Sequence, residues 1–181
     1  TTAFGAFVGL LPDRDAGIVI LTNATNVGLP DAIGAWIADR LLGNPERDYA
    51  AERLEGARKQ AETEHAAFAP PADAGPAPDL APLAGAWENP TFGTATLAPG
   101  ADGFSLTIDA TGARLPLAAW DGYVFTLGLA REGAFAGIAS NLGEDPIGFA
   151  EFQVDAAGRR NLLNLTMAED GATFLFTRKA P

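Results

Sequence analysis

The sequence contains no cysteine and a single histidine, His65. The absence of cysteine excludes disulfides, thiolate catalysis and thiolate metal sites, although it does not fix a cellular compartment. One histidine cannot build a multi-histidine metal site within the chain. No apolar run approaches the roughly 20 residues that a membrane-spanning helix needs. We therefore expect no metal, no other cofactor and no insertion into a membrane.

Basic residues are also scarce. The chain has 12 Lys and Arg against 23 Asp and Glu, which gives a formal net charge of -11. Such an acidic surface repels phosphate backbones and anionic lipid headgroups. Nucleic acid and a membrane surface are therefore not expected as partners.

Apolar residues make up 48% of the 181 positions, which is enough to form one or two packed domains. Its hydrophobic period is helical in the first part and close to two from Leu83 onward. We expect an α+β protein with three segments: residues 1–45, the last strands and helix of an α/β domain; 46–82, a connecting helix and linker; and 83–181, an antiparallel barrel.

The first 23 residues predict a β-hairpin. Two apolar runs, FVGLL and GIVILTN, flank the turn residues 12–17. Neither run alternates with polar residues, so we expect both faces of the hairpin to be covered by protein. Because a two-stranded ribbon is not stable alone, we expect this chain to be the C-terminal part of something longer, or one half of a processed pair.

Two helices and a linker are predicted next. Apolar residues recur at helical spacing from Leu29 to Leu41, and Gly43 provides a stop signal. This helix should lie on the sheet that contains the hairpin. Residues 46–67 are charged and rich in alanine, which predicts a solvated helix. Residues 69–82 contain five prolines and predict an extended linker between domains.

The last hundred residues predict a small barrel or sandwich of about eight short strands, because period-two runs alternate with Gly-containing turns. The alternation slips between Phe149 and Phe152, which predicts either a β-bulge there or a strand that exchanges its faces. Aromatic side chains are expected to fill the interior: Phe104, Trp120, Phe125, Phe149, Phe152, Phe174 and Phe176.

Two stretches resemble a known family. The run TTAFGAFVGLLPDRDAGIVILTN, followed by LPDAIGAWIADRLLG, resembles the end of the catalytic domain in serine β-lactamase-like hydrolases, the group with penicillin-binding-protein-like peptidases and esterases. The run PLAGAWENPTFGTATLAPGADGFSLTI resembles the opening of the lipocalin-like barrel appended to such enzymes. The residues that carry this second match are Gly85, Trp87, Asn89, Pro90, Phe92 and Gly93.

The resemblance implies an enzyme that forms and hydrolyses an acyl-serine on a small-molecule or peptide amide or ester. It also implies a periplasmic or secreted protein, with a barrel that caps the active-site mouth or mediates homo-oligomerisation. The family's Ser-x-x-Lys motif is absent, since neither Ser105 nor Ser140 has lysine three positions later. The Tyr-x-Asn and Lys/His-Thr-Gly motifs are absent too. We therefore expect no catalytic residue here, no activity of the chain alone, and a partner that is an N-terminal catalytic segment or a companion chain.

Thr1, Thr2 and Ala3 are the candidate rim of a substrate pocket shared with that partner, because by the resemblance they follow the third active-site motif. Thr1 has an alternative role as an N-terminal nucleophile activated by its own α-amine. Only its identity and position support that role.

Other polar residues have a structural and a functional interpretation. His65 lies near Glu62 and Glu64, where a solvated helix face explains it better than a metal site. Turn formation accounts for one acidic pair, Asp13 and Asp15. The other pair, Glu144 and Asp145, precedes a proline in a loop, and nothing in the sequence marks it as the two carboxylates of a glycosidase.

A non-enzymatic function is the competing class. In it the barrel binds a small apolar ligand or a partner, and the first segment only tethers the barrel. The aromatic residues that could line a ligand cavity are Trp87, Phe92, Trp120 and Tyr123. Core filling is the other interpretation, because small barrels are usually filled by their own side chains.

Overall fold

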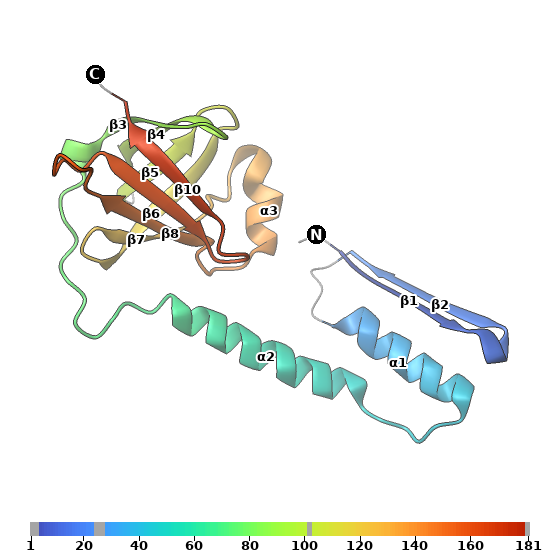
Figure 1. Cartoon of the computed structure of the whole chain (residues 1–181). Coiled ribbons are helices and arrows are strands. Elements are labelled where there is room, and N and C mark those ends of the chain that lie inside the picture. The colour runs from blue at the N-terminus through green and yellow to red at the C-terminus, as the bar shows by residue number, and fades with distance from the viewer. Residues whose placement is uncertain (1–3, 24–27, 101–102, 180–181) are drawn as a thin grey trace. The chain divides into compact units, whose positions relative to one another are not determined.

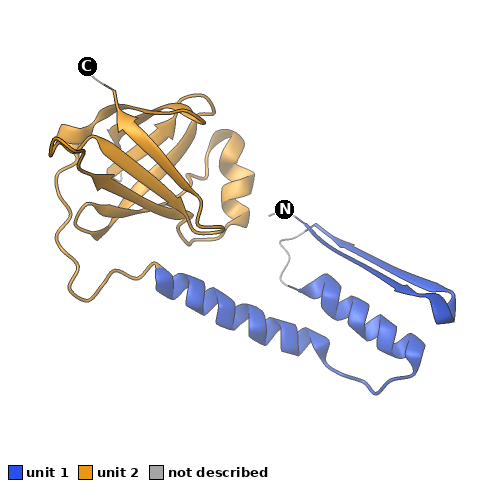
Figure 2. Ribbon diagram, in the orientation of Figure 1, with its two compact units in different colours: residues 1–67 blue, residues 68–181 orange. Residues whose placement is uncertain are grey.

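A computed structural model of the chain describes residues 4–23, 28–100 and 103–179. The chain divides into two compact units, residues 1–67 and 68–181 (Figure 2). The first is a hairpin with two helices and the second is a barrel, so the fold is α+β (Figure 1). None of the described helices combines the length and the apolar character needed to cross a membrane.

The first unit begins with the predicted hairpin. Strands β1 (Gly5–Leu11) and β2 (Ala16–Thr22) pair antiparallel, with Val8 opposite Val19. A short 3-10 turn (Pro12–Arg14) joins them, and Asp15 follows it with a left-handed φ of 48°. Both the hairpin prediction and the position of its turn are confirmed.

Helix α1 (Leu29–Leu42) packs on one face of this hairpin, and α2 (Tyr49–Ala67) packs on α1. The predicted stop is confirmed, since Gly43 caps α1 with a φ of 74°. The contact between α1 and β1 is close because Gly34 has no side chain: a Cβ there would lie 2.3 Å from the Phe7 ring. The helix therefore approaches the strand closely at this point.

The second unit is a closed barrel of eight antiparallel strands in the order β10-β3-β4-β5-β6-β7-β8-β9, which confirms the barrel prediction. The strands are β3 (Gly85–Asn89), β4 (Gly93–Gly100), β5 (Gly103–Ile108), β6 (Ala113–Asp121), β7 (Val124–Leu127), β8 (Gly148–Gln153), β9 (Leu162–Met167) and β10 (Thr173–Arg178). A 3-10 turn (Ala81–Leu83) precedes β3. The β7–β8 connection carries a second 3-10 turn (Gly133–Phe135) and α3 (Ala136–Asn141).

Aromatic side chains meet in the barrel interior. Trp87 packs edge-on against Phe152, with ring centroids 5.6 Å apart, and Phe125 contacts the same ring at 5.9 Å. The largest fully buried side chains of the barrel are Trp87, Phe152, Phe176, Leu97, Leu106, Leu127 and Leu163. Phe104 and Phe174 pack against this core from partly buried positions. For these aromatic residues the predicted interior position is confirmed.

Two predictions about the barrel are wrong. Phe149 and Trp120 lie outside the core cluster, where their rings contact each other at 5.1 Å. Strand β8 has no phase slip, because Gly148, Ala150 and Phe152 alternate regularly as buried residues. The irregularity lies instead in β6, between Ala119 and Asp121. Phe149 suggested a slip because it is an apolar side chain on the outer face, where another part of the chain covers it.

The proline-rich segment lies within the second unit. Phe68 stacks on Phe149, with centroids 5.2 Å apart. Further along, the Gly75 N–H donates to the Asp121 carboxylate at 2.8 Å. Leu80 and Leu83 are buried in the core. Residues of the predicted extended linker therefore contact the barrel at several points.

Candidate functional site

The three candidate rim residues, Thr1, Thr2 and Ala3, lie outside the described residues. The same holds for the alternative in which Thr1 acts as a nucleophile. Both assignments remain predictions from the sequence.

Serine and lysine do not come together in the part of the chain that the structure describes. Ser105 is buried in β5, and the Ser140 hydroxyl donates to the Ala136 carbonyl at 2.7 Å. Both lysines bind carboxylates: Lys59 lies 2.6 Å from Glu55, and Lys179 lies 2.7 Å from Glu88.

A lysine that activates a serine must be able to lose its proton. The hydrogen bond to Glu88, together with its charge, raises the pKa of Lys179 above the usual 10.5. This change is opposite to the one that a general base needs, so Lys179 is a surface ion-pair residue.

The other polar candidates occupy positions that turns and ion pairs explain. His65 is exposed on α2, and Glu144 binds Arg131 at 2.7 Å. The Asp15 N–H donates to the Pro12 carbonyl at the hairpin turn. Among residues 4–23, 28–100 and 103–179, His, Asp and Glu form no group of three that could hold a metal ion.

The four candidate cavity aromatics of the barrel do not share one cavity. Trp87 is in the core, and Trp120 lies on the outer face beside Phe149. Tyr123 is 38% exposed, with the Arg160 guanidinium 3.4 Å from its ring centroid. Phe92 is 36% exposed and packs edge-on against Phe174. This arrangement favours core filling and surface packing over a ligand cavity.

The motif from Gly85 to Gly93 builds the start of the barrel. Gly85 and Gly93 have positive φ values of 116° and 70°. The Trp87 indole N–H donates to the Leu83 carbonyl at 3.2 Å. The Asn89 amide donates to the Leu175 carbonyl at 2.8 Å and accepts from the backbone N–H groups of the turn that follows. Gly85, Trp87, Asn89 and Gly93 therefore each have a structural role at the start of the barrel.

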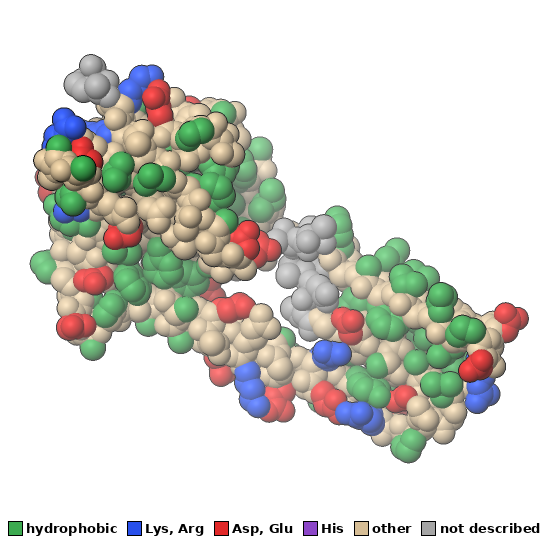
Figure 3. All heavy atoms as spheres, in the orientation of Figure 1, with side chains coloured by type: hydrophobic (Ala, Val, Ile, Leu, Met, Phe, Trp, Pro, Cys, Tyr) green, Lys and Arg blue, Asp and Glu red, His purple; other side chains and the backbone are tan. Residues whose placement is uncertain are grey.

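The strongest candidate site is an apolar surface of the first unit. One face of the hairpin is covered by α1, and the other is exposed. We call the exposed side the open hairpin face; it consists of Ala6, Val8, Leu10, Gly17, Val19 and Leu21. Val8 and Val19 are each 67% exposed, and Leu10 and Leu21 are each 75% exposed. Figure 3 shows hydrophobic side chains gathered over the first unit.

The edges of the hairpin are open as well. In the described structure β1 and β2 pair only with each other, so each strand has one unpaired edge. Unpaired edges and a contiguous apolar face both mark interaction surfaces in soluble proteins. The sequence predicts cover on both faces, but within the first unit α1 covers only one.

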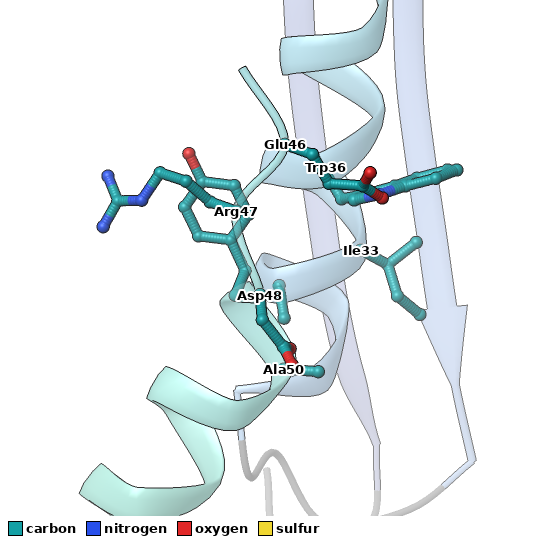
Figure 4. Close-up of a pocket in the computed structure, with 8 residues that line it drawn as sticks. Ile33, Trp36, Glu46, Arg47, Asp48 and Ala50 are labelled. Carbon is teal, nitrogen blue, oxygen red and sulfur yellow. The ribbon is translucent and has the colours of Figure 1, made fainter. Parts of the chain in front are cut away.

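A shallow groove lies where α1 meets the start of α2. Ile33 and Trp36 extend from α1 on one side, and the chain from Glu46 to Ala50 borders the other (Figure 4). Nearby, Asp39 accepts hydrogen bonds from the Tyr49 hydroxyl at 2.6 Å and the Asn44 amide at 2.8 Å. These bonds hold the connection between the two helices, which gives this cluster a structural role.

The hydrogen bond from Asn44, followed by that from Tyr49, lowers the pKa of Asp39 below the usual 3.8. Because the pKa is lowered, the two hydrogen bonds stabilise the junction at pH values above the unfolded-state pKa of Asp39. This stability is lost as the pH falls through the folded-state pKa. We expect Tyr49→Phe to raise the pKa of Asp39 toward 3.8. NMR titration of the Asp39 carboxyl carbon tests this, and an unchanged midpoint in Tyr49→Phe would contradict it.

Comparison with known proteins gives one structural likeness to report. No protein-family model and no curated protein matches the chain. A solved structure, the crystal structure of the C-terminal domain of penicillin-binding protein Rv0907, is similar with a TM-score of 0.41 and 27% sequence identity. The similarity covers 60% of this chain and 93% of that one. The chain is thus similar in part to the C-terminal domain of a penicillin-binding protein.

Proposed function

We propose that this chain is the C-terminal portion of a serine hydrolase, in which the first unit completes the sheet of a catalytic α/β domain. The rest of that domain comes from an N-terminal catalytic segment or a companion chain. The observation that carries the proposal is the open hairpin face with its two unpaired edges. The type of enzyme comes from the resemblance of residues 1–23, 29–43 and 82–108 to β-lactamase-like hydrolases.

The physical argument starts from what the hairpin lacks. A strand that is apolar on both faces belongs in the middle of a layered α/β structure, with helices on each side. Helix α1 supplies one of these layers. A partner that adds a strand to one edge and a helical layer on the open hairpin face would pair one of the two open edges and cover the exposed apolar side chains.

The chemistry then belongs to the partner. A serine activated by a nearby lysine would attack the carbonyl of an amide or ester, form an acyl-serine, and release it to water. In the described structure both lysines of this chain form surface ion pairs with carboxylates. The chain contributes structure, and we expect it to be inactive alone.

The experiment uses the tagged full chain as bait in an extract of the source cells. Bound proteins are treated with a fluorescent penicillin and a fluorophosphonate, which acylate or phosphonylate reactive serines. We expect a labelled partner with the native chain and no label on the chain itself. The double variant Val8→Lys, Leu21→Lys should lose that partner, because two charges would be buried on the open hairpin face.

The control is Leu175→Lys, which places one such charge at a 47% exposed position of the barrel. It should retain the labelled partner. Label on Ser105 or Ser140 of this chain would overturn the proposal, as would a captured protein that neither probe labels. A second copy of the chain as the bound protein would show that the open hairpin face serves self-association instead.

A further inference from the structure

We infer that residues 68–75 form a releasable latch on the barrel, which sets how much free chain joins the two units. The latch consists of the segment FAPPADAG and has two anchor points on the β6–β7 side of the barrel. This inference is independent of the proposed hydrolase function, because every contact that carries it lies within the second unit.

The first anchor is aromatic. The Phe68 ring stacks on Phe149 at a centroid distance of 5.2 Å, and the Trp120 ring meets Phe149 edge-on at 5.1 Å. The Trp120 indole N–H donates to the carbonyl of Ala69 at 3.2 Å. An indole that binds the carbonyl just before two prolines resembles the way aromatic grooves hold extended proline-rich peptides.

The second anchor is polar. The Gly75 N–H donates to the Asp121 carboxylate at 2.8 Å, and the Gly122 N–H donates to the Gly75 carbonyl at 3.2 Å. Both backbone polar groups of Gly75 are thus hydrogen-bonded to the β6–β7 turn. A Cβ at this position would lie 3.4 Å from the Asp121 oxygen, an ordinary van der Waals distance, so the anchor depends on the two backbone hydrogen bonds.

The burial pattern separates the latch from the barrel core. Phe68, Pro71 and Gly75 are half-buried, and the residues between them are exposed. In contrast, Leu80 and Leu83 are 3% and 7% exposed and belong to the core. The strand ring closes through β10 and β3 without the latch. Release of residues 68–75 would therefore leave the barrel intact.

Release would change the tether. Helix α2 ends at Ala67, so the docked latch begins at the next residue. An undocked segment from Phe68 to Asp79 adds 12 residues of free chain. A proline-rich chain extends by about 3.1 Å per residue, so these residues would span up to roughly 37 Å. The latch therefore gives the connection a short and a long state.

The experiment uses the full chain and changes both sides of the interface between the latch and the barrel. Phe68→Ser changes the latch, and the double variant Trp120→Leu, Asp121→Ala changes the barrel surface. In both we expect the Gly122 amide to exchange with solvent at least tenfold faster, and the core amides of Ala150 and Leu163 to keep their native rates. The control is Asp109→Ala, which removes a surface carboxylate that accepts from the Thr96 hydroxyl at 3.0 Å.

The tether is measured with spin labels at Glu62→Cys and Glu169→Cys, since the native chain has no cysteine. The distance distribution should broaden in both latch variants and stay unchanged in Asp109→Ala. An unchanged Gly122 exchange rate or an unchanged distribution would overturn the inference. Equal acceleration of the core amides would also overturn it, because the segment would then be an inseparable part of the barrel.

Discussion

Replacement of Gly148 by alanine is expected to separate β8 from β9 at one end of the barrel. A Cβ at this position would lie 2.2 Å from the Thr166 carbonyl oxygen and 3.1 Å from the Met167 Cα. Both are backbone atoms of the paired strand, where Gly148 lies opposite Met167. The overlap cannot be relieved by rotating a side chain, so the strands must move apart. We expect a loss of about 3 kcal/mol, the upper part of the range for overpacked sites.

The matched control is Gly137→Ala on α3, where a Cβ would have no heavy atom within 4 Å. Alanine is favoured over glycine in a helix by about 1 kcal/mol at most, so this variant should be neutral or slightly more stable. Urea unfolding of both variants, followed by near-ultraviolet circular dichroism, makes the comparison. Equal midpoints for the two variants would show that β8 and β9 can adjust to the extra methyl group.

The second large effect is expected at Trp87. This side chain is fully buried, packs against Phe152, and donates its indole N–H to the Leu83 carbonyl. Trp87→Ala would leave a large cavity and an unpaired buried carbonyl, and comparable substitutions cost about 3–5 kcal/mol. We expect partial or complete loss of the folded barrel at room temperature, measured by equilibrium unfolding.

Two further variants test why Trp87→Ala is expected to destabilise the barrel. Trp87→Phe keeps an aromatic ring but removes the N–H donor, so its loss should be smaller than that of Trp87→Ala. Trp36→Ala makes the same truncation in the first unit, at a side chain that is 42% exposed, and should leave the barrel transition unchanged. A Trp87→Ala barrel that unfolds at the native urea concentration would contradict the assigned core position.

Much of the secondary structure could be predicted from the sequence. The hairpin turn follows from Pro12 to Gly17, and the end of α1 follows from Gly43. The barrel strands follow from a period of two with glycine-containing turns between them. These signals are local, because a residue's period and turn chemistry depend on its immediate neighbours in the chain.

The outer face of the barrel could not be predicted in this way. Phe149 and Trp120 are large and apolar, and a period-two pattern places such residues inside. They lie outside because Phe68, 81 positions before Phe149, stacks on the outer face. Nothing in the sequence near Phe149 shows that this cover exists. The bulge was misplaced for the same reason, since an outward phenylalanine imitates a phase slip.

For the candidate site, too, the sequence predicted one part and the tertiary structure decided the other. The two apolar runs of the hairpin indicated that both of its faces need cover. Which face α1 occupies depends on the close approach of Gly34 to Phe7, and this in turn leaves Val8 and Leu21 on the open hairpin face. The candidate rim residues near Thr1 remain a prediction.

The sequence alone therefore determined the secondary-structure elements of this protein: an apolar hairpin, two helices, and about eight short strands. It also showed that the chain contains no Ser-x-x-Lys, Tyr-x-Asn or Lys/His-Thr-Gly motif. Only the tertiary structure decided which apolar side chains have cover and which remain exposed. The physical reason is that burial depends on contacts between residues far apart in the chain, whereas period and turn chemistry are local.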